Sequence, residues 1–359
     1  MGYLLLFRMQ MKHVVLLLAL SFLTACGSLK NSQSVNPPAG ADGLQGNSGS
    51  TAAGINIKQP EAAAPKKILS NEFSDNTRVL GIMNYLASDD LKGRDSGSEG
   101  IEKAAEFIEG IFLQNKLEPY FKTYRDTLAN YHNTAYNIVG VVKGTDKKLQ
   151  NEYIVIGAHY DHIGILTPEN GDAIANGAND NASGTTTVLE LARYFGNSRS
   201  NKRSLIFALF SAEEKGLLGS SHLAKKLKEE DLNLYLMINF EMTGVPMVNK
   251  DYMMYVTGYS KSNMAEVSNR YANKNLVGYL PSAKEFGLFQ RSDNYPFHKE
   301  FNIPSQTYCT FDFTNFNFYH KVGDEVDQMD FEHMSGLINN MIPVIEGFSN
   351  SAEQEVKYY

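Results

Sequence analysis

Four short apolar runs alternate with longer segments of helical spacing along the middle of this chain. The runs are residues 137–142, 153–158, 205–210 and 236–240. The last three are almost continuously apolar, which is typical of strands that are covered on both faces. Strands that alternate with helices build a largely parallel sheet between two helix layers. The sequence therefore predicts an α/β fold, a three-layer α/β/α sandwich with a mostly parallel, mixed central sheet.

Helical spacing is clearest between residues 99 and 115. Apolar side chains recur there every three or four positions, at Ile101, Ala104, Ala105, Ile108, Ile111 and Phe112. This spacing places them on one face of a helix, which can pack against the predicted sheet. A second segment of this kind spans residues 187–194. We expect both helices to cover the sheet.

Polar side chains that can bind a metal follow three of the runs directly. They are His159 and Asp161 after the run 153–158, Glu213 and Glu214 after 205–210, and Glu241 after 236–240. The carboxyl ends of parallel strands meet at one edge of a sheet, where α/β proteins form their active sites. We therefore expect these side chains to lie close together.

Two further candidate ligands lie outside those runs. Asp180 stands in the glycine-flanked segment 177–184, just before a predicted helix, and His320 ends a later apolar run. Each signal is weak alone, because Asn-Asp-Asn is usually a turn and Glu-Glu is usually a helix start. Imidazole and carboxylate together, without thiolate, suit a borderline or hard cation.

Charge and cysteine content exclude two classes of protein. The chain has 33 Lys and Arg against 40 Asp and Glu, a net charge of −7, whereas a nucleic-acid-binding protein normally has a basic face. With only two cysteines, it cannot be a disulfide-stapled scaffold. We expect no nucleic-acid partner.

Residues 1–25 have the pattern of a secretory signal peptide. Arg8 and Lys12 precede the apolar run 14–20, and small residues follow it. The segment ending in Cys26 resembles the lipobox of bacterial lipoproteins, in which that cysteine is acylated. Residues 26–67 are rich in Gly, Ser, Asn, Ala and Pro, as in a disordered tether. We therefore expect a globular domain over 68–359. We expect it to lie outside the cytoplasm, in the bacterial cell envelope, and to be anchored through Cys26 to the lipid bilayer of the outer membrane.

Five separated motifs occur in an order that resembles a known family. They are His159-x-Asp161, the segment 177–184, Ser211-Ala212-Glu213-Glu214-x-Gly216-x-x-Gly219-Ser220, Asn239-x-Glu241 and Tyr319-His320. Together they resemble the secreted bacterial leucyl-type zinc aminopeptidases with two co-catalytic zinc ions, which belong to the zinc-dependent exopeptidase superfamily, metallopeptidase clan MH. The resemblance covers roughly residues 80–345. It implies a hydrolase that acts on N-terminal residues of peptide substrates.

The resemblance also assigns the metal ligands. One Zn²⁺ takes His159, the other takes His320, and Asp180 bridges them, while Glu214 and Glu241 each join one ion. Three carboxylates and a bridging hydroxide then balance the charge of two Zn²⁺ ions. His162 lies three residues after His159, but the family uses only the first histidine of this motif. We therefore expect His162 not to bind metal.

Two further roles follow from the resemblance. Glu213 is the general base, which takes a proton from the bridging water and delivers it to the leaving amine. Asp161 accepts a hydrogen bond from the free ring N–H of His159 and so fixes its tautomer. The peptide bond between Asp180 and Asn181 is cis in the family.

Glu241 departs from the pattern, because aminopeptidases of this family usually have Asp there. Metal binding should survive, since Glu keeps the charge and the oxygen ligand. The polarity of the substrate stays open, and a carboxypeptidase-like exopeptidase is one alternative. Glutaminyl cyclase is another, although such enzymes line their pocket with Trp and this chain has none. A non-catalytic binding domain of the same fold is the third.

Overall fold

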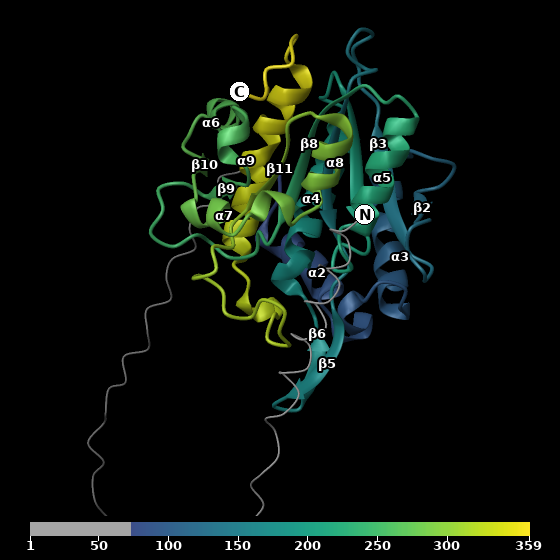
Figure 1. The fold of residues 1–359 in the computed structure, drawn as a ribbon, viewed down its shortest axis with the longest axis vertical. Helices are drawn as coiled ribbons and strands as arrows, with labels where there is room; N and C mark the ends of the chain where they lie inside the picture. The colour runs from purple at the N-terminus through teal and green to yellow at the C-terminus, as the bar shows by residue number, and fades with distance from the viewer. Residues whose placement is uncertain (1–72) are drawn as a thin grey trace, which may run out of the picture. The chain divides into compact units, whose positions relative to one another are not determined.

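A nine-stranded mixed sheet runs through the centre of the described part of the chain, residues 73–359 of the computed structural model (Figure 1). Its strands are β1 (Glu118–Pro119), β2 (Arg125–Thr127), β3 (Tyr136–Val142), β4 (Tyr153–His159), β7 (Ser204–Phe210), β8 (Leu234–Glu241), β9 (Met254–Val256), β10 (Val277–Gly278) and β11 (Ser305–Cys309). A separate hairpin pairs β5 (Gly164–Glu169) with β6 (Asp172–Ala175). The expected signal peptide, Cys26 and tether lie outside the described residues.

The helices connect these strands. The α-helices are α2 (Asn76–Leu86), α3 (Glu99–Gln114), α4 (Gly184–Ser198), α5 (Leu218–Glu229), α6 (Met264–Ala272), α7 (Pro281–Glu285), α8 (Asn294–Phe301) and α9 (Phe331–Asn350). Shorter helical turns are η1 (Asp89–Arg94), η2 (Ala178–Ser183), η3 (Tyr259–Lys261), η4 (Leu288–Gln290) and η5 (Val326–Gln328). None of the helices between residues 73 and 359 combines the length and apolar character needed to cross a bilayer.

The sheet is parallel in the middle and antiparallel toward both sides. Its strand order is β1-β3-β7-β4-β8-β11-β9-β10, with β2 beside β3. Strands β7, β4, β8 and β11 pair in parallel, whereas β3 is antiparallel to β7 and β9 is antiparallel to β11. The predicted mixed sheet is confirmed, and its four parallel strands are the ones that end at the candidate site.

Helices cover both faces of the sheet and bury its central strands (Figure 1). On one face, Leu223 and Leu227 of α5 and Phe297 of α8 pack against Val155 and Ile206. On the other face, α2, α3, α4, α6 and α9 form the larger core with the alternate side chains of the same strands. Because both faces are covered, the central strands read as continuous apolar runs in the sequence.

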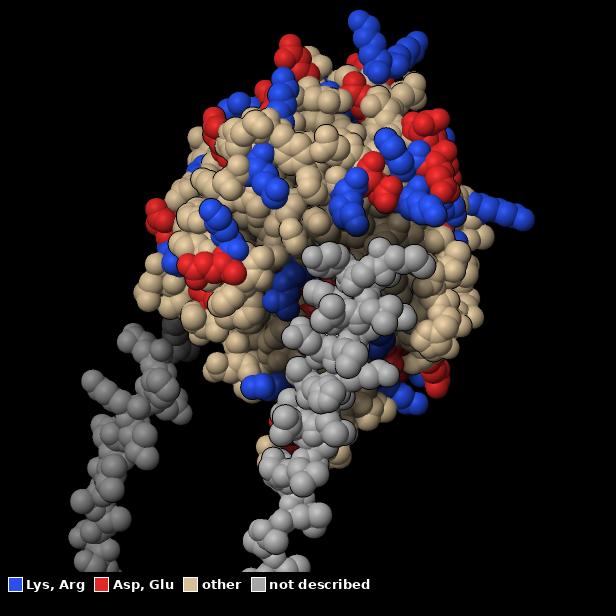
Figure 2. All heavy atoms as spheres, viewed as in Figure 1, with Lys and Arg blue, Asp and Glu red and all other residues tan. Residues whose placement is uncertain are grey.

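The four predicted strands and the first predicted helix agree with the observed elements to within two residues. The second predicted helix is α4, which begins three residues before the segment 187–194 and ends four residues after it. The helix expected over 99–115 is α3, Glu99–Gln114, which begins where the Ser98 side chain accepts a hydrogen bond from the N–H of Ile101. The run 205–210 corresponds to β7, and the run 236–240 extends to β8. Figure 2 shows acidic and basic side chains interspersed on the face that it displays, as on an ordinary solvated surface.

Candidate metal centre

The carboxyl ends of the parallel strands bring the candidate residues to one edge of the sheet. Strand β4 ends at His159, which lies beside Phe210, the last residue of β7. The turn after β7 then carries Glu213 and Glu214, and β8 ends at Glu241. Asp180 comes from η2, just before α4, and His320 comes from the loop between β11 and α9. Strand pairing therefore places side chains from distant parts of the chain in one site.

Asp180 presents one carboxylate oxygen to each of two histidines. Its Oδ1 lies 3.3 Å from His159 Nε2, and its Oδ2 lies 3.2 Å from His320 Nε2. Glu214 Oε2 is also 3.2 Å from His320 Nε2. Two ligands of one tetrahedral zinc ion, each about 2.0–2.1 Å from the metal, lie about 3.3–3.4 Å apart. The spacing of these donor atoms fits two cation positions on either side of Asp180.

The electrostatics of the site favour cations. Burial opposes the charged form of His320, but Asp180 and Glu214 outweigh it and raise the His320 pKa to about 10. Burial and the neighbouring Asp180 work against ionisation of Glu214, yet hydrogen bonds with His162 and His320 hold its pKa below the ordinary value. The carboxylates thus create a negative field that draws protons onto the histidines. Two dications would satisfy the same field.

Glu241 enters the site from the end of β8. It is buried, and its carboxylate accepts a hydrogen bond from the hydroxyl of Ser292. Burial raises the Glu241 pKa to about 7, with His159 opposing the rise and Asp180 adding to it. Asp293, the next residue after Ser292, is fully buried, and neither of its carboxyl oxygens has a hydrogen-bond partner of good geometry. A nearby cation would stabilise the ionised form of both carboxyl groups.

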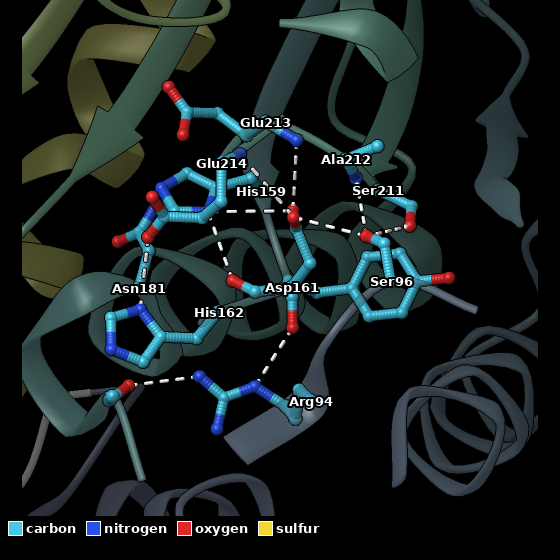
Figure 3. Close-up of polar contacts among 12 residues, drawn as sticks. Arg94, Ser96, His159, Asp161, His162, Asn181, Ser211, Ala212, Glu213 and Glu214 are labelled. Atoms are coloured by element: carbon cyan, nitrogen blue, oxygen red, sulfur yellow. Dashed lines mark hydrogen bonds and ion pairs between the residues drawn. The ribbon is translucent and has the colours of Figure 1, made fainter. Parts of the chain in front are cut away.

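Glu213 and Glu214 stand on a turn that Asp161 holds. The backbone N–H of Glu213 donates to Asp161 Oδ1 at 3.1 Å, and that of Glu214 donates to Oδ2 at 3.4 Å (Figure 3). The hydroxyl of Ser96 also donates to Oδ2 at 3.1 Å. Burial raises the pKa of Glu213 well above its ordinary value; His159 opposes the rise, and Glu241 and Asp293 add to it. A carboxylate in this state accepts a proton readily.

The expected hydrogen bond between His159 and the Asp161 carboxylate is not the one that the structure forms. His159 Nδ1 lies 3.2 Å from the backbone oxygen of Asp161 and 3.7 Å from its Oδ1. The carbonyl is closer because it lies only two residues along the chain, and the carboxylate is already engaged by Ser96 and the turn. The His159 tautomer is therefore held by the backbone, and Asp161 positions the turn that carries Glu213.

Arg94 is a functional-site residue to which the sequence analysis gave no role. It is fully buried, and its guanidinium donates to the backbone oxygens of Tyr160 at 2.8 Å, Asn176 at 2.6 Å and Gly177 at 2.9 Å. These hydrogen bonds connect the end of β4 to the loop before Asp180. Burial lowers the Arg94 pKa to about 10, so the side chain stays charged at neutral pH.

Asn181 and Asp324 hold Asp180 from two other directions. The amide of Asn181 donates to the backbone oxygen of Phe240 at 3.0 Å and accepts from the N–H of Met242 at 3.0 Å, which links η2 to the end of β8. Asp324 accepts hydrogen bonds from the N–H groups of Asn179 at 2.7 Å and Asp180 at 3.0 Å. The bond between Asp180 and Asn181 is cis, as the resemblance implies.

His162 lies inside the site, which its sequence position alone does not reveal. It is fully buried, and its Nδ1 is 3.0 Å from Glu214 Oε1. One ring nitrogen of His162 and one carboxylate oxygen each of Asp180 and Glu214 all lie within 4.8 Å of one another. One feature of the sequence pointed to the site: His162 lies three residues after His159, which is the last residue of a buried strand.

Comparison with known proteins defines the family. Residues 137–345, more than half of the chain, match Peptidase family M28. The chain belongs to this family. It is 28% identical over 207 residues to a probable leucine aminopeptidase of Arthroderma otae, covering 55% of this chain and 53% of that protein. This M28 chain thus spans about half the length of the curated leucine aminopeptidase that it matches.

Two solved structures share the fold. One is a zinc aminopeptidase from Bacillus subtilis, with 19% identity, a TM-score of 0.58, and coverage of 76% of this chain and 94% of that one. The other is a glutaminyl cyclase from Fimbriiglobus ruber, with 18% identity, a TM-score of 0.60, and coverage of 76% and 95%. At such identities the likeness establishes the zinc-exopeptidase fold of this M28 chain and does not choose between the two activities.

Proposed function

We propose that this M28 chain is a zinc-dependent exopeptidase, an aminopeptidase that hydrolyses the N-terminal residues of peptides. The observation that carries the proposal is that the two oxygens of the Asp180 carboxylate face different histidines. Oδ1 lies 3.3 Å from His159 Nε2, and Oδ2 lies 3.2 Å from His320 Nε2. Glu214 and Glu241 complete a set of five ligands for two Zn²⁺ ions. A single site for one ion would not need a carboxylate with both oxygens facing imidazoles.

The protein's own residues move the proton in this mechanism. When bound, the two zinc ions supply Lewis acidity toward the scissile carbonyl and acidify a water molecule. Glu213 accepts a proton from that water as the oxygen adds to the carbonyl carbon. It then delivers the proton to the amine nitrogen as the C–N bond breaks. Asp161 keeps Glu213 in place through the backbone N–H at 3.1 Å.

A pocket beside Glu241 supports a preference for apolar side chains. Its walls are largely apolar or aromatic and include Met242, Leu288, Phe311, Phe313 and Tyr319. Pockets with such a lining bind apolar groups, and a few polar contacts fix the orientation of the bound group. We therefore propose a leucyl-type preference at the N-terminal residue of the substrate.

Arg291 favours a second candidate, a carboxypeptidase-like exopeptidase. Its exposed side chain lines the same pocket. A guanidinium pairs with a carboxylate through two parallel hydrogen bonds, so it could bind the free C-terminus of a peptide. Glu241 replaces the aspartate usual in aminopeptidases at the position near the substrate's amino group. The polarity of the substrate therefore needs a direct test.

We expect the zinc-loaded protein to cleave a leucyl peptide with a free N-terminus. The N-acetylated copy should be cleaved at least about 100-fold more slowly, because a site that pairs with a charged group rejects an analogue that lacks this group. Amidation of the C-terminus should change the rate little. Mass spectrometry of the products identifies the bond that breaks. Cleavage of the acetylated peptide from its C-terminal end would instead establish the carboxypeptidase-like activity. Conversion of an N-terminal glutamine to pyroglutamate, without hydrolysis, would indicate a glutaminyl cyclase.

We also propose that the protein is a secreted lipoprotein of the bacterial envelope. The basic start, the apolar run 14–20 and the residues before Cys26 support this reading. The catalytic domain would then act outside the cytoplasm, tethered to the outer membrane by residues 26–67. Cells grown with labelled palmitate should yield labelled protein, and Cys26→Ser should lose the label. An unlabelled wild-type protein would contradict the anchor without affecting the proposed catalysis.

A further inference from the structure

His162 is held tightly against the candidate metal centre. Its ring packs on Gly177, where an added Cβ would lie 2.5 Å from the His162 Cγ. Its backbone N–H donates to the backbone oxygen of Arg94 at 3.2 Å. The ring lies edge-on to that of His320, with 5.7 Å between the centroids. These contacts leave His162 little freedom, so the direction of its Nδ1 atom is set by the fold.

We propose that His162 is a positioning residue whose Nδ1–H donates a hydrogen bond to Glu214 Oε1 and thereby aims Oε2 at the cation position shared with His320. The inference rests on the proposed zinc centre and deepens it. Figure 3 shows the carboxyl group of Glu214 directed at the His162 ring. The two oxygens of Glu214 are thus divided: Oε1 lies 3.0 Å from His162 Nδ1, and Oε2 lies 3.2 Å from His320 Nε2.

The distances argue against His162 as a ligand of the same ion. Its Nδ1 lies 3.9 Å from Asp180 Oδ2, whereas two ligands of one tetrahedral zinc lie about 3.3–3.4 Å apart. His320 meets that spacing with both carboxylates, at 3.2 Å and 3.2 Å. The 3.0 Å separation from Glu214 is the ordinary length of an N–H···O hydrogen bond.

The second ring nitrogen of His162 supports the same assignment. A histidine that binds metal almost always donates its other ring N–H to an acceptor. His159 has such a partner, since its Nδ1 lies 3.2 Å from the backbone oxygen of Asp161. The Nε2 atom of His162 is buried and has no hydrogen-bond partner within residues 73–359. A proton there would be an unpaired buried donor, so the proton belongs on Nδ1, where the Glu214 carboxylate accepts it.

Two substitutions in the full-length protein distinguish His162 as a hydrogen-bond donor to Glu214 from His162 as a metal ligand. In His162→Asn, the side-chain amide N–H can occupy the place of Nδ1–H, whereas His162→Leu has a similar size and no donor. Zinc affinity is measured by competition with a chelating dye, and the visible spectrum is recorded with cobalt(II) in place of zinc. We expect His162→Leu to bind the more weakly held zinc ion about 10–100-fold less tightly, because this is the usual effect of removing a residue that hydrogen-bonds to a metal ligand. His162→Asn should stay within about threefold of the wild type, and both saturated variants should keep the wild-type cobalt spectrum.

Three results would overturn the inference. Wild-type affinity in His162→Leu would show that the hydrogen bond does not matter. Equal losses in both variants, together with an altered cobalt spectrum, would make the imidazole a ligand. If His162→Leu does not fold, His162→Gln replaces it, because a glutamine amide nitrogen takes the position of Nε2 and leaves the Nδ1 position without a donor. Unchanged zinc affinity in His162→Gln would again refute the donor. A wild-type protein that binds no zinc would instead refute the proposed function, before any variant is made.

Discussion

Replacing Glu213 by glutamine should reduce peptide hydrolysis by about a thousandfold while the bound zinc stays in place. Glutamine has the shape of glutamate but cannot accept a proton, and general acid–base catalysis contributes about 10²–10⁴-fold to enzymatic rates. The burial that raises the pKa of Glu213 suits it to this role. The measurement is kcat for a leucyl peptide, together with zinc content by atomic emission.

The matched control for this substitution is Glu229→Gln. Glu229 is an exposed residue at the end of α5, so its loss should leave both rate and zinc unchanged. Activity close to the wild type in Glu213→Gln would remove this residue from the role of general base. Loss of zinc in the same variant would show that Glu213 is a ligand instead.

Replacing Asp180 by asparagine should have an effect of similar or greater size, through the metal. The substitution removes a negative charge from between the two cation positions and leaves a neutral amide facing His159 and His320. We expect zinc to fall from two ions per chain to one or fewer after dialysis. Removing a residue that hydrogen-bonds to a metal ligand usually lowers activity about 10–100-fold. Because Asp180 is itself a proposed ligand, the loss of activity should be larger than this.

Asp172→Asn provides the control for this second prediction, since Asp172 is exposed in the β5–β6 hairpin. Circular dichroism establishes whether Asp180→Asn has folded, and added zinc at high concentration shows whether lost activity returns. Retention of two zinc ions with full activity in Asp180→Asn would contradict the bridging role. A wild-type content of one zinc ion per chain would contradict the two-metal centre itself.

The fold was largely predictable because burial on both faces leaves a direct mark in the sequence. The runs 153–158, 205–210 and 236–240 are nearly continuous in apolar residues, and they correspond to β4, β7 and β8 at the centre of the sheet. The antiparallel pairing of β3 with β7 could not be read in the same way. Strand direction depends on the path of the connecting segments, which periodicity does not record.

The strand ends also indicated the place of the site. Parallel strands deliver the residues after their last apolar position to one edge, and five motifs in family order suggested which residues bind zinc. The hydrogen bonds behind them could not be predicted. The carboxylate of Asp161 is taken by donors from Ser96 and the turn at Glu213, so His159 pairs with a backbone oxygen instead. That outcome depends on distances of a few tenths of an ångström.

By itself, the sequence determined the layer architecture and the edge of the sheet on which the chemistry lies, because apolar periodicity and strand ends are local properties of the chain. The order of its five motifs indicated the family by resemblance. Only the tertiary structure decided which polar atoms meet. Arg94 lies more than 60 residues from Tyr160, and His162 lies more than 50 residues from Glu214, yet both pairs are in hydrogen-bond contact. Such contacts arise from the packing of distant segments around a buried site, where each donor finds the nearest free acceptor.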